Sequence, residues 1–288
     1  MSAAPPRIFD RLLIARRYAR RQQRGEDFLT ALVNEDLRER LAAITRRFDK
    51  ALAVGPDAAL LPSEADTAEG PVKFARLATL AEAPGIMSFN PQMPVLPGGD
   101  YNLVVSLLDL QAIDDMPGYL AAIRRAMRAD GLFIGAVLGG ASLGELRQAW
   151  LAAESGMRGG AVPRVAPMLD VRDAGMLLQR AGFALPVTDI ETHELRYADP
   201  LALMREIKSL AASNPLLQRS GKPVTRPLLM RAMEEYQRIA GLPDGRVRAT
   251  IEIVWMSGWT PHQSQQKPLR PGSARARLSD VLKDKSGG

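Results

Sequence analysis

The sequence predicts an α/β fold built on a mostly parallel sheet with an antiparallel addition at one edge. Short apolar runs alternate with helical patterns in the first half of the 288-residue chain, and such alternation is typical of parallel strands joined by right-handed crossovers. A mainly helical stretch follows, interrupted by two long strand patterns at 187–197 and 247–259. These two strands are expected to extend the sheet at its edge.

Each element has a signal of its own. Apolar runs that fit buried strands occur at 51–54, 72–77, 85–89, 102–108 and 132–138. Amphipathic patterns predict helices at 11–24, 26–48, 116–131, 142–156, 171–181, 199–212 and 225–240. The helix at 116–131 is the best marked, because Pro117 suits its first turn and Gly131 suits its end.

These elements divide the chain into three parts. We expect an N-terminal helical extension at 1–48 that packs on the core, and a central α/β domain at 49–260. The helical patterns at about 199–240 form an insertion in that domain, which would act as a lid. The tail at 261–288 is polar and basic, with few apolar residues to bury.

Composition and charge exclude several classes of protein. The chain has no cysteine, so disulfides, thiolate metal sites and cysteine nucleophiles are excluded. Its net charge of +6 comes mainly from the two ends, so the core is not expected to bind nucleic acid. No apolar run approaches the ~20 residues of a membrane span, and we expect a cytoplasmic protein.

One long stretch of the sequence resembles a known family. "YNLVVSLLDLQAIDDMPGYLAAIRRAMRADGLFIGAVLGGASLGELRQAW" is similar to the segment from the fourth to the fifth strand of class I S-adenosylmethionine-dependent methyltransferases. Within that superfamily it resembles the methyltransferase-like assembly factors of respiratory complex I, described as arginine hydroxylases, and their proteobacterial relatives. "FDRLLIARRYAR", "DVRDAGMLLQRAGFALPVTDIE" and "QQKPLRPGSARARL" continue the likeness over nearly the whole chain. Malonyl-carrier-protein methyltransferases are more distantly similar.

The resemblance implies a Rossmann-like fold with a seven-stranded mixed sheet, six strands parallel and one antiparallel, and helices on both faces. It also implies an S-adenosylmethionine site at the carboxyl ends of the strands. There the implied cofactor-binding residues are Gly55 and Asp57 after the first strand, Asn90 after the third, and Ser106 and Leu108 at the end of the fourth.

The sequence departs from the family pattern at this site. The turn after the first strand has the single glycine Gly55, followed by Pro56 and Asp57, where the family has a glycine-rich loop that lets the cofactor approach the backbone. Between Pro71 and Ala81 no carboxylate is present to bind a ribose. Asn90 replaces an aspartate that commonly meets the adenine amine, although its amide oxygen can still accept a hydrogen bond.

Acidic residues at the tip of the fourth strand are candidates for catalysis. Asp109 could orient a substrate nitrogen or act as a base. Asp114 and Asp115 either join it or cap the helix that follows, and we favour the caps. After the fifth strand, Ser142 and Glu145 fit a capping box.

The segment after the fifth strand, "LGGASLGELR", is also a candidate substrate site. It faces the expected cleft, and its glycines would leave room for a substrate. The candidate substrate residues are Gly139, Gly140, Glu145 and Arg147.

The two histidines, His193 and His262, predict no metal site. His193 lies among polar residues of a strand and His262 lies in the tail. An iron site of two histidines and one carboxylate would require them to converge.

Two functions remain open from the sequence. The first is S-adenosylmethionine-dependent methyl transfer to an unknown acceptor, through a weakened cofactor site. The second is a non-catalytic or hydroxylase-like assembly factor that binds a protein client, either a subunit or an assembly intermediate of respiratory complex I.

Overall fold

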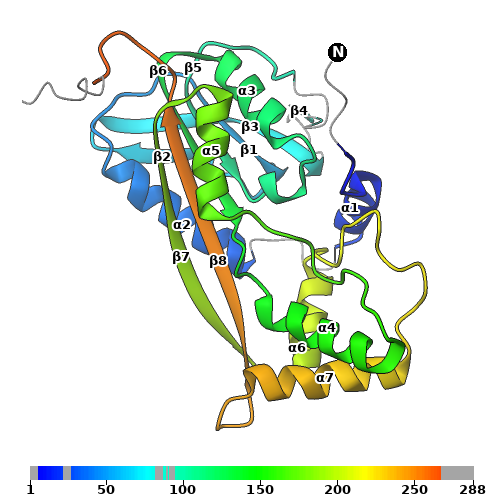
Figure 1. Cartoon of the computed structure of the whole chain (residues 1–288). Helices are drawn as coiled ribbons and strands as arrows, with labels where there is room; N and C mark the ends of the chain where they lie inside the picture. Colours follow the sequence, from blue (N-terminus) through cyan, green and yellow to red (C-terminus); the bar gives the residue numbers. More distant parts are fainter. Residues whose placement is uncertain (1–5, 22–26, 82–86, 89, 91–94, 267–288) are drawn as a thin grey trace, which may run out of the picture.

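A single twisted sheet forms the centre of the molecule in the computed structural model, which describes residues 6–21, 27–81, 87–88, 90 and 95–266 (Figure 1). The strand order is β2-β3-β1-β5-β6-β8-β7, and β4 pairs with β3. The strands are β1 (Ala51–Asp57), β2 (Glu64–Thr67), β3 (Gly70–Ala81), β4 (Met87–Ser88), β5 (Tyr101–Leu107), β6 (Met127–Leu138), β7 (Ala184–Tyr197) and β8 (Val247–Trp259).

The directions of the strands confirm the predicted mixed sheet. Strands β4, β3, β1, β5 and β6 pair in parallel. Strand β8 runs antiparallel to both β6 and β7, so β7 points the same way as the parallel strands. Six strands therefore run in parallel and one against them, and the short β2 adds an antiparallel hairpin with β3.

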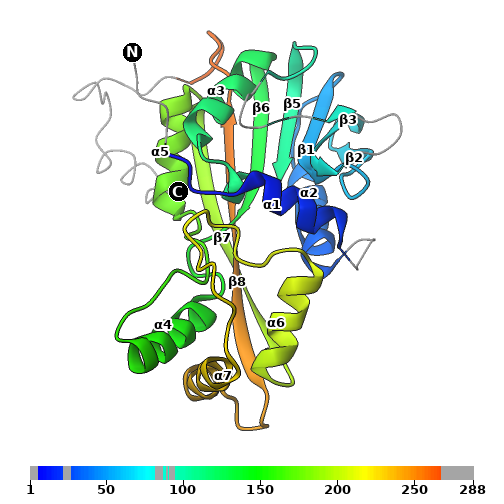
Figure 2. The same cartoon turned by 90° about the vertical axis from the view of Figure 1, so that its right-hand side faces the viewer.

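Helices cover both faces of this sheet. In chain order they are α1 (Arg11–Ala19), α2 (Phe28–Ala42), the short 3-10 helix η1 (Leu110–Ala112), α3 (Met116–Ala126), α4 (Gly144–Arg158), α5 (Val171–Ala181), α6 (Pro200–Ser209) and α7 (Arg226–Ala240). Helix α2 lies on one face, and α3 with α5 lies on the other. Figure 2 shows α1 between the parallel strands and α6.

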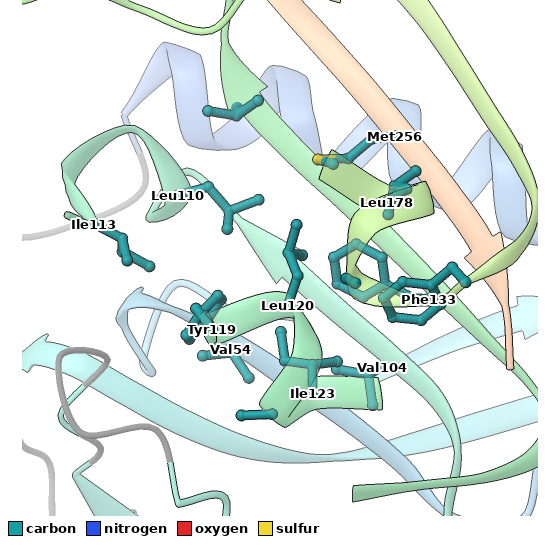
Figure 3. Packing of buried hydrophobic residues seen from close by; sticks show 14 of the residues in the cluster. Val54, Val104, Leu110, Ile113, Tyr119, Leu120, Ile123, Phe133, Leu178 and Met256 are labelled. Carbon is teal, nitrogen blue, oxygen red and sulfur yellow. The ribbon is translucent and has the colours of Figure 1, made fainter. Parts of the chain in front are cut away.

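The alternation of β5 divides the core between the two faces. All seven residues of β5 are buried. Val104 points into the cluster under α3 and α5, whereas Leu103 and Val105 point into the cluster under α2, as the two-residue period of a strand requires. Figure 3 shows Val104 beside Ile123 of α3.

A second layer of helices lies away from most of the sheet. Helices α4, α6 and α7 gather around the far ends of β7 and β8 (Figure 1). They form an apolar cluster of their own, which includes Trp150, Leu203 and Tyr236. None of the described helices has the length and apolar character needed to cross a membrane.

Element boundaries differ from the prediction in several places. Helix α3 ends at Ala126, because the chain already pairs at Met127 with Tyr101 of β5. Gly131 therefore lies inside β6, where a Cβ would meet the Tyr101 carbonyl oxygen at 3.1 Å. Helices α1 and α2 also end earlier than expected, and most of the predicted tail, 267–288, lies outside the described residues.

Candidate functional site

The candidate site is the edge of the sheet at which the parallel strands β1, β3, β5 and β6 end. In open α/β sheets the carboxyl ends of neighbouring strands form the ligand-binding crevice. Gly55 pairs with Ala78 of β3, and Val54 pairs with Ser106 of β5. The predicted cofactor residues on β1 and β5 therefore lie on adjacent strands of one edge.

The turn after β1 is held by its own backbone and by α2. The Asp57 carboxylate accepts a hydrogen bond from the Ala59 amide at 2.9 Å, and the Asp57 carbonyl accepts one from the Leu60 amide. The Asn34 side chain on α2 donates to the Leu60 carbonyl at 3.1 Å. The Asp57 carboxylate is thus engaged in closing the turn.

Position 55 has room only for a glycine, because neighbouring atoms pack closely against its backbone. A Cβ at this position would lie 2.8 Å from Cδ2 of Leu61 and 2.9 Å from the carbonyl oxygen of Leu107. Real Cβ atoms do not come this close to other heavy atoms, so a methyl group on Gly55 would require Leu61 and the Leu107 carbonyl to move. The Leu61 side chain, itself buried, therefore packs directly against Gly55.

Arg11 of α1 crosses the ends of β3 and β5. Its guanidinium donates to Oδ1 of Asp109 at 3.4 Å and to the carbonyl oxygens of Thr79 and Ala112, also at 3.4 Å. The Thr79 hydroxyl lies 2.8 Å from the same Asp109 oxygen and 3.3 Å from the Gly55 carbonyl. Three strand ends and α1 are therefore tied together by side chains of the chain itself.

Asp109 is a buried carboxylate with one satisfied oxygen. Its exposed fraction is 2%, and its Oδ2 has no hydrogen-bond partner within the described residues. Burial raises the pKa of the nearby Tyr119 hydroxyl, and the negative charge of Asp109 raises it further. The catalytic role assigned to Asp109 stays a prediction, and the structure shows it as the centre of the tie to Arg11.

The other predicted cofactor residues are placed less favourably. Ser106 is fully buried, and Leu108 has a left-handed backbone with φ of 56° that directs its amide to the Ala136 carbonyl. Asn90 is exposed, and both of its neighbours lie outside the described residues. Glu82, the carboxylate nearest to the end of the second parallel strand, is outside them as well.

Asp114 and Asp115 have different roles. Asp115 caps α3, because its carboxylate accepts a hydrogen bond from the Gly118 amide at 2.9 Å. Asp114 accepts hydrogen bonds from the amides of Ile8 and Phe9. The expectation of a helix cap is thus correct for Asp115, and Asp114 instead binds the segment that leads into α1.

The predicted substrate residues anchor the loop after β6. A Cβ on Gly139 would lie 2.2 Å from Oε1 of Glu252 on β8, and Gly140 donates to the Leu169 carbonyl at 3.0 Å. Glu145 accepts hydrogen bonds from both the hydroxyl and the amide of Thr250, at 2.6 and 3.3 Å. Their role towards a substrate stays a prediction.

Arg147 binds backbone carbonyl oxygens within this loop and the segment that follows α4. Its guanidinium donates to the carbonyl oxygens of Gly140, Ser142 and Ala166 at 3.4–3.5 Å. The predicted capping box is wrong: Ser142 instead hydrogen-bonds the backbone of Glu252, and α4 begins after Leu143, which has a φ of 54°.

In the arrangement described, side chains of the chain itself occupy part of the edge at which S-adenosylmethionine would bind. Leu61 and the Leu107 carbonyl leave no room for a side chain on Gly55, and one oxygen of the Asp57 carboxylate is used within its turn. Arg11 lies between Thr79 and Asp109, across the ends of the strands that would flank a cofactor. Sequence reasoning missed Arg11, Thr79 and Leu61, because no local pattern marks them.

An apolar hollow opens at this same edge, lined in part by Asp57, Leu61 and Leu108. It consists of two adjoining cavities of about 150 and 200 Å³. The residues that line both come from α1, the strand ends and the segment after α6: Tyr18, Pro56, Gln111, Leu138, Leu210 and Ala212. Oε1 of Gln111 is buried without a hydrogen-bond partner among the described residues, so the hollow offers an acceptor within an apolar wall.

Several known proteins are similar to the whole chain or to two thirds of it. The arginine-hydroxylase NDUFAF5 of Rattus norvegicus is 30% identical over 291 residues, covering 96% of this chain and 84% of the rat protein. The Danio rerio protein of the same name is 38% identical over 183 residues, or 64% of this chain and 57% of its own length. A malonyl-[acyl-carrier protein] O-methyltransferase of Laribacter hongkongensis is 34% identical over 67% of this chain and 62% of its own.

The chain thus spans little more than half the length of the zebrafish protein. No family model matches it. Among solved structures, the YcgJ protein of Bacillus subtilis has a TM-score of 0.49 and 7% identity, with 79% of this chain and 97% of that protein covered.

These relatives correct one prediction and support another. The rat and zebrafish proteins are mitochondrial by name, which contradicts the predicted cytoplasmic location. The rat protein matches almost the full chain, and the strand order and directions agree with the methyltransferase-like sheet expected from the sequence. The chain belongs to the NDUFAF5 family of methyltransferase-like proteins.

Proposed function

We propose that this chain is an assembly factor for respiratory complex I that holds a segment of a client subunit in the apolar hollow beside its strand ends. The observation that carries the proposal is the tie between Arg11 and Asp109, which crosses the strand ends where the fold would bind a cofactor. The hollow next to it stays open and is lined by residues from α1, the sheet and the segment after α6.

The lining suits an extended peptide with one basic side chain. Apolar walls of Pro56, Leu138 and Leu210 would cover aliphatic parts of a segment. Oε1 of Gln111 and Oδ2 of Asp57, the carboxylate oxygen that the Ala59 amide does not use, would accept hydrogen bonds from a guanidinium. The name of the rat and zebrafish relatives, arginine-hydroxylase, supports arginine as that side chain.

Photo-crosslinking in the organism that makes the chain tests this proposal. A photoreactive phenylalanine analogue in place of Leu210 reports on the hollow, and the same analogue in place of Glu234, an exposed residue of α7, is the matched control. We expect subunits or assembly intermediates of complex I to be captured from position 210 and not from position 234. Equal capture at both positions, or none from complex I, contradicts the proposal.

A measurement of complex I itself completes the test. Loss of the chain should lower the amount of fully assembled complex I on native gels and leave the other respiratory complexes unchanged. Normal complex I in cells that lack the chain contradicts the assembly role directly.

Methyl transfer is the second candidate function, and the malonyl-carrier-protein methyltransferase relative favours it. It requires the edge to bind S-adenosylmethionine, and the closed edge predicts that binding is weak. We expect calorimetric titration of the full chain to give no saturable heat at about 1 mM ligand. Micromolar binding would show that Arg11 and Leu61 move aside, and would make methyl transfer the better proposal.

A further inference from the structure

A histidine and two carboxylates meet between α2 and the edge strand β7. Asp36 lies on α2, and Glu191 and His193 lie two residues apart on β7. Because side chains alternate along a strand, Glu191 and His193 point to the same face. One ligand atom from each of the three side chains lies within 4.8 Å of the others, and all three residues are half-buried.

Two of the atoms in this cluster lack the partners that buried polar atoms normally have. Oδ2 of Asp36 and Nε2 of His193 are shielded from solvent and have no hydrogen-bond partner within the described residues. A buried polar atom without a partner destabilises the folded chain. A bound cation would satisfy both atoms at once, and Nε2 of a neutral imidazole is a frequent metal ligand.

The charges around the cluster also favour a cation. Arg40 of α2 pairs with Asp189 at 2.8 Å and with Oε1 of Glu191. Within the described residues, Arg40 is the cation that pairs with Asp189 and Glu191, and the Asp36 carboxylate adds a further negative charge to this cluster.

We propose that Asp36, Glu191 and His193 bind a divalent metal ion of the zinc class. Carboxylate oxygens and an imidazole nitrogen are ligands that zinc accepts with tetrahedral geometry, and three protein ligands leave one position for water or another molecule. The site is separate from the closed cofactor edge, because β7 lies beyond β6 and β8 in the sheet.

This site was not expected from the sequence, because a metal site there seemed to require the two histidines to meet. His193 pairs with Ile251 on β8, and His262 follows the end of β8 at Trp259. The intervening strand is roughly 25 Å long, so the two imidazoles do not meet. The third ligand is instead the carboxylate of Asp36, which lies on α2 and is far from β7 in the sequence.

Calorimetric titration of the full chain with zinc chloride, after treatment with a chelator, tests the proposal. We expect one zinc ion per chain, with the affinity lowered at least roughly tenfold in His193→Gln and in Asp36→Asn. His262→Gln removes the other imidazole and is the matched control, so its affinity should equal that of the wild type. No saturable binding at about 1 mM zinc, or equal binding by His193→Gln and the wild type, overturns the proposal.

A spectroscopic measurement makes the result independent of the folding of any one variant. Cobalt(II) bound by the wild-type chain should give the visible absorption of a four-coordinate ion, and zinc should displace it. A spectrum that stays that of aqueous cobalt overturns the proposal. If His193→Gln unfolds, Asp36→Asn decides, because it keeps the size of the side chain and removes its charge.

Discussion

The Arg11 guanidinium on the first helix lies 3.4 Å from Oδ1 of Asp109, at the end of a strand 98 residues further along the chain. Both partners are largely shielded, with side-chain exposures of 13% and 1%. Removing one member of such a pair leaves an uncompensated buried charge, whereas removing both restores neutrality.

We therefore expect Arg11→Met to destabilise the chain by about 3 kcal/mol, and Asp109→Asn by a similar amount. The double variant should lose less than the sum of the two single variants, since the charges depend on each other. Urea unfolding of the four proteins measures this coupling. Additive losses would show that the two side chains do not interact.

The close packing of Leu61 over Gly55 gives a second prediction. Gly55→Ala forces a methyl group to within 2.8 Å of Leu61 and 2.9 Å of a backbone oxygen, and should cost about 1–3 kcal/mol of unfolding free energy. Gly156→Ala in α4 is the matched control, because nothing lies within 4 Å of the added carbon. There we expect stabilisation by about 0.5–1 kcal/mol. Equal effects at the two positions would contradict the packing at Gly55.

Glu145 should act as an anchor of α4 on β8. Glu145→Ala removes the acceptor for the Thr250 hydroxyl and amide, and should cost about 2 kcal/mol, while Glu145→Gln keeps one acceptor oxygen and should cost less. Glu234→Ala on the exposed face of α7 should change stability by less than about 0.5 kcal/mol. Chemical denaturation separates the three. A Glu145→Ala protein as stable as the wild type would contradict the anchoring role.

The docking of α1 should depend on pH through Asp10. The Leu13 amide and Arg219 lower the pKa of this N-cap carboxylate from its usual 3.8. A lowered folded-state pKa means that the stabilisation is present above about pH 4 and is lost as the pH falls further. Wild type should therefore be more stable than Asp10→Asn at pH 7, and the difference should shrink as the pH falls below about 4. A difference that is independent of pH would contradict this linkage.

Much of the fold could be predicted because its signals are local. The strand and helix alternation, Asp115 with Pro117 at the start of α3, and the apolar face of each strand are all readable within a few residues. Strand β2 was missed because its four residues, Glu64–Thr67, are too short to show a two-residue period. The boundary of α3 was missed because pairing of Met127 with Tyr101 overrides a glycine signal five residues after the last helical residue.

The candidate site was less predictable because its contacts are long-range. Ser142 looked like a helix cap, but its partner is Glu252, 110 residues away. Arg11 and Asp109 are separated by a similar number of residues. No local pattern distinguishes Arg11 from the other arginines of its basic run. The ends of β5 and β6 agree with the prediction within one residue, whereas β1 and β3 continue three and four residues further than expected. What fills the space between the strand ends depends on how distant segments come together.

The way α1 is held has a consequence for any molecule that enters the cofactor edge. Arg11, Ile8 and Phe9 are bound by Asp109 and Asp114 of that same edge. A ligand placed between the strand ends must displace the start of the chain, so the two compete for one surface. The free energy that docks the first helix therefore reduces the apparent binding free energy of every such ligand. Ligand binding would release the N-terminal segment, and faster cleavage of that segment by a protease would report it.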